Sequence, residues 1–229
     1  ITSYEYTNET VLDNMPKACS VEQITSAFNS VGFSSPPSWL KPYSVLSNGQ
    51  KMRVDLARAI LEEQKMFVFD EFTSVVDRNV AQIGSFAMQK AIRKTNKQFI
   101  AVTCHFDVQD WLLPDWVFNT DTMTFQSFEG QKKNRPDIKF EIFNYGDKTI
   151  WKMFAKHHYL SHSHNNAANV FIATVNDEIA GFISILHLPN KDPRIKKVHR
   201  LVILPDYQGA GIGLKLLNEV GKLYKRDKW

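Results

Sequence analysis

The chain has 229 residues, of which 43% are hydrophobic and 23% charged, with a formal net charge of +4. This composition is that of a globular protein with enough apolar residues for one large core or two modest ones, and it excludes a fibrous or disordered chain. The longest apolar runs are strand-sized, far below the roughly 20 residues that cross a bilayer, so we expect no membrane segment and no signal peptide.

Cysteine usage points to a reducing environment. The chain has only Cys19 and Cys104, too few for a disulfide framework or a zinc cluster, so we expect a cytoplasmic protein. The mildly basic balance permits anionic ligands without indicating DNA binding. Because the chain begins with Ile1, we expect that it is a piece of a longer protein.

Helical and strand-like patterns alternate in the first half of the chain. Apolar residues spaced three or four apart indicate helices, and short apolar runs indicate buried strands. The predicted elements, in chain order, are a helix at 21–31, a helix at 50–61, a strand at 66–69, a helix at 80–93 and a strand at 98–104. This order predicts an α/β fold with a parallel sheet, in which ligands collect at the carboxyl ends of the strands.

The helix at 50–61 has a clear apolar stripe. Met52, Leu56 and Ile60 repeat every four residues, which predicts that they face the core. Arg53 falls between them, and like the other basic residues of this helix it is expected to face solvent.

A second set of elements follows a polar break. The apolar periodicity is lost between residues 120 and 137, and we place a domain border there, with one domain at 1–135 and another at 136–229. The elements predicted beyond the border are a helix at 148–158, a hairpin of strands at 169–175 and 179–187, a strand at 197–204 and a helix at 212–224.

Two adjacent acids, Asp70 and Glu71, end the strand at 66–69. Like charges held together repel unless a cation or proton intervenes, which indicates Mg²⁺ near Asp70 and leaves Glu71 to polarise a water. In isolation the pair is explained equally well as the start of a solvated loop.

Four segments in this order resemble those of the ABC-type ATPases. Leu46-Ser47-Asn48-Gly49-Gln50 is similar to their signature loop, Phe67–Glu71 to their Walker B strand, Ser74–Asp77 to their D-loop and His105 to their switch histidine. The sequence departs from the family at Asn48, where glycine is usual, and at Phe72, where proline is frequent.

The resemblance implies a nucleotide site shared between two subunits. Asp70 would hold Mg²⁺, Glu71 would orient or deprotonate the attacking water, and His105 would contact the γ-phosphate. The residues implied in binding the ATP of the opposite subunit are Ser47, Asn48, Gly49 and Gln50. A homodimer is therefore part of the implied mechanism.

Alternatives stay open for this half of the chain. Taken singly, His105 is explained as well by a core histidine and Asp77 by a helix N-cap. No Gly-x-x-x-x-Gly-Lys-Ser/Thr phosphate loop occurs among the 229 residues. We expect either a piece of a longer protein, which the intact signature and Walker B segments favour, or a vestigial ATPase domain.

A glycine-rich loop, Gln208–Gly213, lies between the predicted strand at 197–204 and the helix at 212–224. Glycines let the backbone approach a pyrophosphate, and a helix N-terminus supplies free N–H groups and a partial positive charge. The spacing of the glycines differs from the dinucleotide fingerprint Gly-x-Gly-x-x-Gly, and a glycine-rich turn without a ligand is the other alternative.

The stretch Val202–Gly213 resembles the acetyl-CoA loop of the GNAT acyltransferases. The resemblance implies a mixed α/β sheet and direct acetyl transfer from acetyl-CoA to an amine. His199, on the strand that faces the site, is the expected general base. The implied coenzyme-binding residues are Leu201, Val202, Ile203, Gln208, Gly209, Ala210, Gly211, Ile212 and Gly213.

Two polar clusters precede this loop in the sequence. A basic run is explained either as a solvated edge or as recognition of coenzyme phosphate or a nucleic-acid acceptor. It comprises Lys191, Arg194, Lys196, Lys197 and Arg200. Four histidines favour an acceptor-side loop over a metal site, and these are His157, His158, His162 and His164.

The sequence therefore predicts an ABC-type ATPase domain coupled to acetyl-CoA-dependent N-acetyl transfer, similar to ATPase–acetyltransferase fusions of bacteria and phages. The expected cofactors are ATP, Mg²⁺ and acetyl-CoA. The expected partners are a second copy of the chain and an amine acceptor, which is a small molecule, a protein or a tRNA. The alternatives are a regulatory or nucleic-acid-associated ATPase whose second domain only binds a ligand, and a structural remnant.

Overall fold

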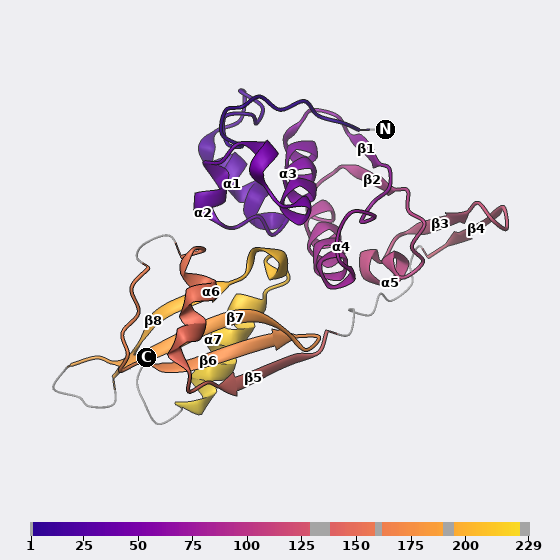
Figure 1. Ribbon diagram of the computed structural model, residues 1–229. Helices are drawn as coiled ribbons and strands as arrows, with labels where there is room; N and C mark the ends of the chain where they lie inside the picture. The colour runs from indigo at the N-terminus through magenta and orange to yellow at the C-terminus, as the bar shows by residue number, and fades with distance from the viewer. Residues whose placement is uncertain (1, 129–137, 159–161, 190–194, 225–229) are drawn as a thin grey trace.

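Two α/β parts follow one another along the chain (Figure 1). The computed structural model describes residues 2–128, 138–158, 162–189 and 195–224. We call residues 2–128 the N-terminal part and the described residues from 138 onward the C-terminal part. The predicted border near residue 135 lies outside the described residues. No helix within the described ranges has the length and apolar character needed to cross a membrane.

The N-terminal part packs helices around a short parallel pair of strands. Its helices are α1 (Val21–Ser30), α2 (Pro36–Trp39), η1 (Tyr43–Val45), α3 (Asn48–Leu61), α4 (Arg78–Ile92) and α5 (Val108–Leu112). Its strands are β1 (Met66–Phe69), β2 (Gln98–Ala101), β3 (Trp116–Asn119) and β4 (Thr124–Ser127). β1 and β2 are parallel, as predicted from the strand–helix–strand pattern, and β3 and β4 form an antiparallel hairpin that was not predicted.

The C-terminal part is an antiparallel sheet with a helix on each face. Its elements are β5 (Phe140–Asn144), η2 (Lys148–Ile150), α6 (Trp151–Ala155), β6 (Asn169–Val175), β7 (Glu178–His187), β8 (Lys196–Ile203), η3 (Pro205–Tyr207) and α7 (Ile212–Leu223). The strand order is β5-β6-β7-β8. Trp151 and Phe154 of α6 pack on one face, and Leu216 and Val220 of α7 pack on the other.

Local sequence explains where these elements begin and turn. α1 and α3 each start with a capping box, in which the N-cap serine and the glutamine three residues later bond to each other's backbone N–H groups. The β6–β7 hairpin turns through Asn176 and Asp177, both at positive φ, which suits the two-residue turns of antiparallel hairpins. The predicted helices at 21–31, 50–61, 80–93 and 212–224 are confirmed, whereas that at 148–158 is shorter, as η2 followed by α6.

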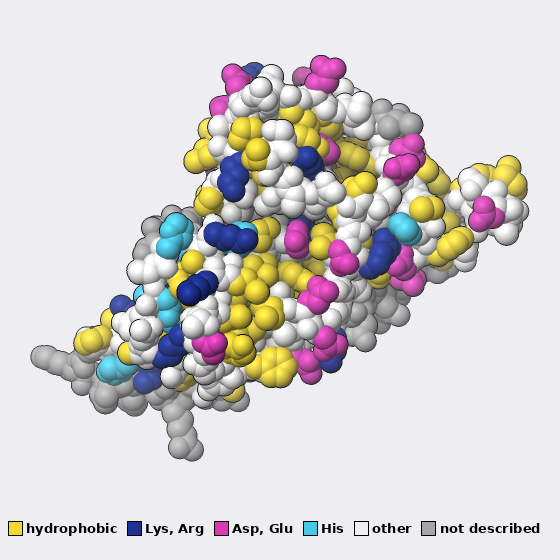
Figure 2. All heavy atoms as spheres, in the orientation of Figure 1, with side chains coloured by type: hydrophobic (Ala, Val, Ile, Leu, Met, Phe, Trp, Pro, Cys, Tyr) yellow, Lys and Arg dark blue, Asp and Glu magenta, His cyan; other side chains and the backbone are white. Residues whose placement is uncertain are grey.

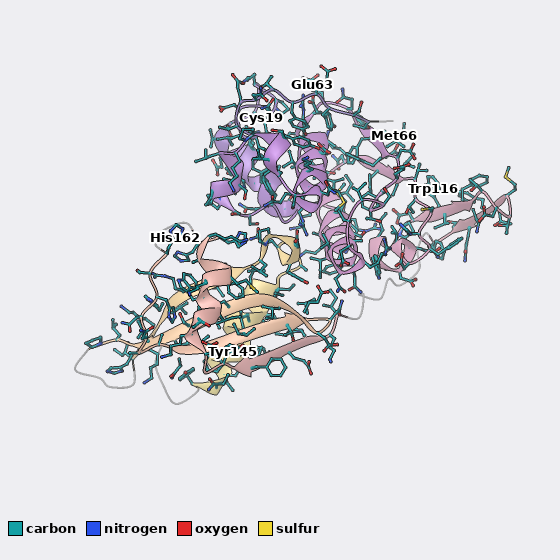
Figure 3. All side chains as sticks on the ribbon, viewed as in Figure 1. Cys19, Glu63, Met66, Trp116, Tyr145 and His162 are labelled. Atoms are coloured by element: carbon teal, nitrogen blue, oxygen red, sulfur yellow. The ribbon has the colours of Figure 1, made fainter. Side chains whose placement is uncertain are left out.

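The predicted mixed α/β fold is confirmed, because the molecule combines a parallel pair with an antiparallel sheet. The β3–β4 hairpin projects from the N-terminal part, and Figure 3 shows Trp116 on it, far from Tyr145 next to β5. Apolar side chains are exposed there (Figure 2), among them Phe118 and Phe125.

The two parts pack against each other. Ile83 of α4 belongs to the same buried cluster as Val175, Tyr207 and Ile212 of the C-terminal part. The side chain of Asn176 in the β6–β7 turn donates to Gln82 Oε1 of α4 at 2.8 Å. This apolar and polar contact places the end of β8 and the following glycine loop beside the helices of the N-terminal part (Figure 1).

Candidate functional site

Two acids and a histidine share one edge of the β1–β2 pair. The strands are parallel with Phe69 opposite Ala101, so Asp70 and Glu71 leave β1 at the edge where the chain leaves β2 toward His105. Both acids are exposed and the histidine is half-buried. Mg²⁺ is commonly held by one or two carboxylates together with substrate phosphates, so this open pair of acids fits that ion.

The turn after β1 has an unusual backbone. Glu71 and Thr73 have φ values of 49° and 69°, which residues other than glycine rarely adopt. The Asp70 carboxylate accepts the Glu71 amide at 3.0 Å, and the amide of the buried Phe72 donates to the Val102 carbonyl at 2.8 Å. These contacts fix the backbone beside the two acids.

The signature loop begins helix α3. Ser47 is the N-cap residue, and its Oγ accepts the Gln50 amide at 3.3 Å. The side chain of Asn48 donates to the Val75 carbonyl at 3.3 Å and so joins the signature loop to the D-loop segment. Ser47 and Asn48 are exposed, which leaves them accessible to a ligand.

Gly49 is buried, unlike its two neighbours on the N-terminal side. A Cβ at this position would lie 3.0 Å from Cγ1 of Val80 and 3.1 Å from Oδ1 of Asp206. The C-terminal part therefore covers this position of the signature loop. In the D-loop segment, the Asp77 side chain accepts the Asn79 amide at 2.8 Å. Asp77 is thus the N-cap residue of α4, which is the alternative that the sequence left open for it.

The glycine loop has an open side at Gly211. Gly211 is the N-cap residue of α7 with φ 84°, and a Cβ there would have no neighbour within 4 Å. Ile212 and Gly213 form the first turn of α7, where backbone N–H groups have no acceptor within the helix. The loop thus provides the amide cradle that an anionic pyrophosphate requires.

The side chains of several predicted coenzyme residues are engaged within the fold. Gln208 uses its side chain within the fold, because Nε2 donates to the Ile203 carbonyl at 2.9 Å and Oε1 accepts the Ser34 amide at 2.8 Å. Val202 packs in the core on the α6 face and Leu201 on the α7 face. Among the described strands β8 has a partner only on its β7 side, so its other backbone edge is available to a ligand.

His199 is the extra residue of a β-bulge. Ser184 pairs with Arg200 and Ile185 with Val198, which leaves His199 without an opposite residue. Its Nε2 accepts the Asn165 amide at 3.2 Å. Burial, and next the charge of Arg200, lower the pKa of His199, so the imidazole is neutral at pH 7.

A second imidazole lies beside it. The rings of His164 and His199 are 5.5 Å apart between centroids, and His164 also packs on Trp151. Both ring nitrogens of His164 are shielded from solvent and have no hydrogen-bond partner among the described residues. Burial, and next the charge of Lys148, lower the pKa of His164, so it too is neutral at pH 7.

His164 lines a surface cavity of about 550 Å³ between η2, α6 and the loop before β6. The residues around it are Gly146, Asp147, Lys148, Thr149, Trp151, Lys152, His164 and Asn166. The cavity combines a neutral imidazole, an aromatic wall, two lysines and the carboxylate of Asp147, which suits an acceptor that carries both an amine and a negative charge.

The histidine-rich stretch does not form a metal site within the described residues, where no group of three His, Cys, Asp or Glu side chains is placed to hold a metal ion. His158 is buried against Trp151, and Figure 3 shows His162 at the periphery near α6. Of the basic run, Lys191 and Arg194 lie outside the described residues. Arg200 donates to the Ser163 carbonyl at 3.1 Å and so braces the loop that carries His164.

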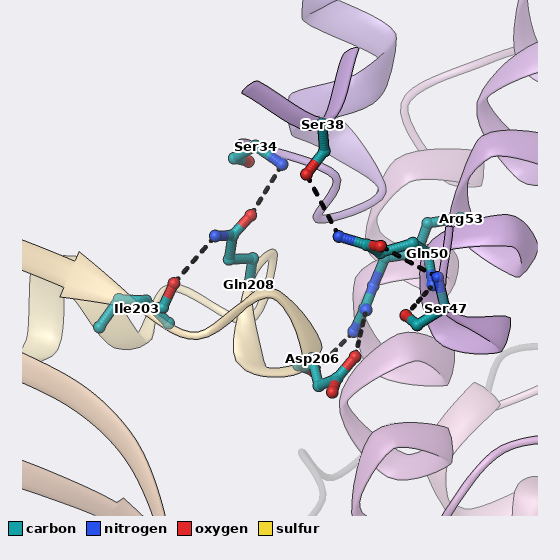
Figure 4. A network of polar contacts seen from close by, with 8 residues as sticks. All are labelled: Ser34, Ser38, Ser47, Gln50, Arg53, Ile203, Asp206 and Gln208. Carbon is teal, nitrogen blue, oxygen red and sulfur yellow. Dashed lines mark hydrogen bonds and ion pairs between the residues drawn. The ribbon is translucent and has the colours of Figure 1, made fainter. Parts of the chain in front are cut away.

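The expectation that Arg53 faces solvent is wrong. Its side chain is 1% exposed, because the C-terminal part covers this side of α3. Nη2 donates to the Asp206 carbonyl at 2.6 Å, and Nη1 lies 3.8 Å from the Asp206 carboxylate (Figure 4). Burial lowers the pKa of Arg53 to about 10, which leaves the guanidinium charged at neutral pH.

The sequence predicted His164 only as one of four histidines in an acceptor-side loop, and it gave Arg53 no contact role. A histidine in a polar loop carries no mark of the aromatic surface that it will contact. The apolar stripe of α3 predicts only the side that faces its own domain, so nothing in the helix marks Arg53 as a contact to the other part.

Two segments of the chain match known protein families. Residues 3–74 match the family of ABC transporter ATPase domains, and residues 166–229 match the acetyltransferase (GNAT) domain family. Both resemblances expected from the sequence are thus confirmed: an ABC ATPase-like segment and a GNAT acetyltransferase segment are present in this one chain.

Two individual relatives match a short stretch of the chain. Over 64 residues, 28% of this chain, it is 42% identical to an ABC transporter ATP-binding protein of Mycoplasma genitalium, MG467, and to its homologue in Mycoplasma pneumoniae. The match spans 20% and 18% of those proteins, so the chain covers about a fifth of the length of these relatives.

Similar solved structures include two ABC proteins. One is MJ1267, an ATP-binding cassette of an ABC transporter in its ADP conformation, with 19% identity and a TM-score of 0.40 over 48% of this chain and 51% of that one. The other is cbiO1 of Clostridium perfringens, part of the transporter complex cbiONQ, with 23% identity and a TM-score of 0.39 over 50% and 48%.

Proposed function

We propose that the C-terminal part transfers an acetyl group from acetyl-CoA to an amine. The observation that carries this proposal is the open amide cradle at Gly211–Gly213, which follows the bulged strand β8 inside the segment that matches the GNAT family. Acetyl-CoA supplies the acetyl group: the amine nitrogen bonds to the carbonyl carbon, the C–S bond breaks, and the amine gives up a proton. The amides of the cradle would hold the pyrophosphate, and the edge of β8 that has no partner among the described strands would align the remainder.

The proton is taken by an imidazole of the C-terminal part. His199, the base predicted from the sequence, already accepts a backbone N–H through Nε2. Among the residues that the structure describes, neither ring nitrogen of His164 has a hydrogen-bond partner, and this histidine lines the cavity and is neutral at pH 7. We therefore assign proton acceptance to His164 and the positioning of its loop, through Asn165, to His199.

A charge at the cradle tests the coenzyme assignment. Gly211→Asp would place a carboxylate beside the pyrophosphate, and Gly211→Asn is the matched control, because both side chains tolerate positive φ and only the first is charged. In calorimetric titration with acetyl-CoA, we expect the Asp variant to bind about tenfold more weakly than the Asn variant or worse. Equal affinities for the two variants would contradict the assignment.

We further propose that the N-terminal part contributes to an ATP site in a homodimer. Asp70 would hold Mg²⁺, Glu71 would orient the attacking water and His105 would contact the γ-phosphate. Ser47, Asn48 and Gln50 would face the nucleotide of the other subunit, and the backbone of Gly49 would reach it once Asp206 no longer covers that residue. The shared edge of β1 and β2 and the exposed start of α3 support this arrangement, as does the tendency of ABC ATPase domains to dimerise.

The second candidate function is a regulatory ATPase whose C-terminal part binds acetyl-CoA without transferring the acetyl group. Thiol release in the presence of acetyl-CoA and a panel of amine, peptide and tRNA acceptors separates the two functions. Transfer requires free thiol in proportion to the acceptor consumed. Binding in the calorimeter without thiol release from any acceptor would favour the regulatory function.

A further inference from the structure

The glycine loop of the C-terminal part rests on the N-terminal part through its backbone. Gly209 and Gly32, which comes directly after the C-cap residue of α1, both have positive φ. A Cβ on Gly209 would lie 2.7 Å from Cα of Gly32, and a Cβ on Gly32 would lie 2.4 Å from the Gln208 carbonyl oxygen. Neither position accommodates a side chain while the other backbone stays in place, so the two loops touch at van der Waals distance.

Two polar contacts between the parts hold the loop ahead of Gly209 (Figure 4). Gln208 bridges the two parts, because it accepts the Ser34 amide and donates to the Ile203 carbonyl at the end of β8. The buried guanidinium of Arg53 donates to the Asp206 carbonyl. Asp206 and Gln208, which both precede Gly209, therefore accept hydrogen bonds from the N-terminal part, whose donors are Arg53 and Ser34.

The contact leaves the ligand side of the loop free. Gly209 faces Gly32 and Ala87 of the N-terminal part, whereas the Cβ direction of Gly211 is open. The loop therefore has one side against the N-terminal part and another available to an anion. Its conformation at Gly209 depends on a surface that lies outside the acetyltransferase segment.

We propose that Arg53, Ser34 and Gly32 are positioning residues for the coenzyme loop: the N-terminal part holds residues 206–211 in the conformation that receives the diphosphate of acetyl-CoA. This proposal rests on the proposed acetyltransferase function. Preorganised donors bind a ligand more tightly because the ordering has been completed before the ligand arrives. Undocking of the N-terminal part thus lowers the affinity of the C-terminal part for its coenzyme.

Arg53→Met is the main variant. It removes the donor to Asp206 but fills a similar volume, and the replacement of a buried, partly unpaired cation by an apolar side chain is often tolerated by the fold. Arg53→Lys keeps a charged donor and serves as the conservative variant. Arg93→Met is the matched control, because Arg93 pairs with Asp115 at the surface of the N-terminal part, away from the loop.

Two measurements on the full chain test the proposal. Amide hydrogen exchange without ligand reports whether residues 206–213 open, and calorimetric titration with acetyl-CoA reports affinity. For Arg53→Met we expect faster exchange confined to the loop and its contacts, and affinity lowered about tenfold, the usual result of losing a charged hydrogen bond. Arg53→Lys is expected to recover part of both, and Arg93→Met to match the wild type.

The outcomes distinguish the positioning role of Arg53 from the proposed acetyltransferase function. Unchanged loop exchange in Arg53→Met overturns the positioning role, and so does faster exchange with unchanged acetyl-CoA affinity. A wild-type chain without affinity for acetyl-CoA contradicts the proposed acetyltransferase function and with it the coenzyme role of the loop, while the exchange data still show whether Arg53 holds the loop.

Discussion

Gly209 shows how one missing side chain determines an interface. Its φ of 91° favours glycine, and an added Cβ would lie 2.7 Å from Cα of Gly32 and 2.9 Å from Cβ of Ala87. The clash involves backbone on the opposite side, which cannot rotate away as a long side chain can. Strain and overpacking therefore act together at this position.

Gly209→Ala is expected to lower the free energy of unfolding by about 1–3 kcal/mol, because both the backbone conformation and the contact become unfavourable. Urea unfolding followed by circular dichroism measures the change. Gly146→Ala is the control: a Cβ there would have nothing within 4 Å, and we expect a change within about 0.5 kcal/mol. Equal losses for the two variants would show that the close contact at Gly209 does not matter to stability.

The two imidazoles of the C-terminal part predict different pH behaviour. Because the pKa values of His164 and His199 are lowered, the neutral base persists below the ordinary histidine pKa, and acetylation should fall only as the pH drops further. For His164→Gln we expect kcat to fall about a hundredfold, and we expect the decrease of acetylation at low pH to disappear. For His199→Gln we expect a smaller loss of kcat, with the decrease of acetylation at low pH retained. If instead the low-pH decrease disappeared in His199→Gln and stayed in His164→Gln, His199 would be the base.

The residue that sequence reasoning placed wrongly is Arg53. Its periodicity in α3 is that of a surface residue, and only the presence of the C-terminal part over this helix makes the site buried. By contrast, the acids at 70 and 71 and His105 were predictable, since the carboxyl ends of parallel strands always share an edge. Residues whose role depends on contact between parts are the ones that periodicity does not reveal.

At the scale of elements, helix α3 is fixed by the chain before it. The hydroxyls of Tyr6 and Tyr43 donate to the two carboxylate oxygens of Asp55 at 2.7 and 2.8 Å, and the two rings stack with centroids 3.9 Å apart. The guanidinium of Arg58 lies over the rings of Tyr4 and Tyr6. This cluster attaches the N-terminal segment to the helix that carries the signature loop.

The tyrosine cluster predicts a loss of stability in alkali. Burial raises the pKa of Tyr4 to about 12, and burial together with Asp55 raises the pKa of Tyr6 and Tyr43 above their ordinary value. A raised pKa in the folded state gives stability that is complete below the unfolded value of about 10 and is lost as the pH rises beyond it. Urea midpoints should therefore fall above that pH, with tyrosinate absorbance appearing as the protein unfolds.

Tyr6→Phe removes one of these ionisations and is expected to flatten the alkaline loss, although it also removes a hydrogen bond at neutral pH. Tyr145→Phe, at an exposed position after β5, is the control and should leave the pH dependence unchanged. If the two variants lose stability in parallel above pH 10, the cluster is not its source.

The long, periodic elements were predictable and the short ones were not. α1, α3, α4 and α7 have clear apolar stripes, and the β6–β7 hairpin has its turn residues between two apolar runs. The β3–β4 hairpin was missed because its aromatic residues, such as Trp116 and Phe118, lie on the exposed side. β5 has only five residues next to a polar segment and gains its structure by pairing with β6.

At the scale of the whole molecule, the two parts meet where both proposed sites begin. Asp206 lies against Gly49 of the signature loop and precedes the glycine loop in the same turn. A nucleotide phosphate at the start of α3 would be repelled by this carboxylate, so we expect nucleotide engagement and docking of the coenzyme loop to influence each other. By linkage, any effect of ATP on acetyl-CoA affinity has an equal counterpart in the other direction.

This linkage is tested in the full-length protein with Glu71→Gln. The variant is expected to retain ATP but to hydrolyse it about a hundredfold more slowly, because the carboxylate that orients the water is lost. Acetylation measured with and without ATP should then differ between the variant and the wild type. Identical acetylation in all four conditions would show that the two activities are independent.

The contact between Gly32 and Gly209 also predicts how these two positions vary in evolution. Gly32 and Gly209 are distant in sequence, belong to segments that match two different families, and each is required by the backbone of the other. Among relatives that retain both segments in this arrangement, the two positions should remain glycine together or change together. Where a relative carries one segment without the other, selection for glycine at the remaining position should be relaxed. The residues at these two positions should therefore show whether a relative has both segments in this arrangement.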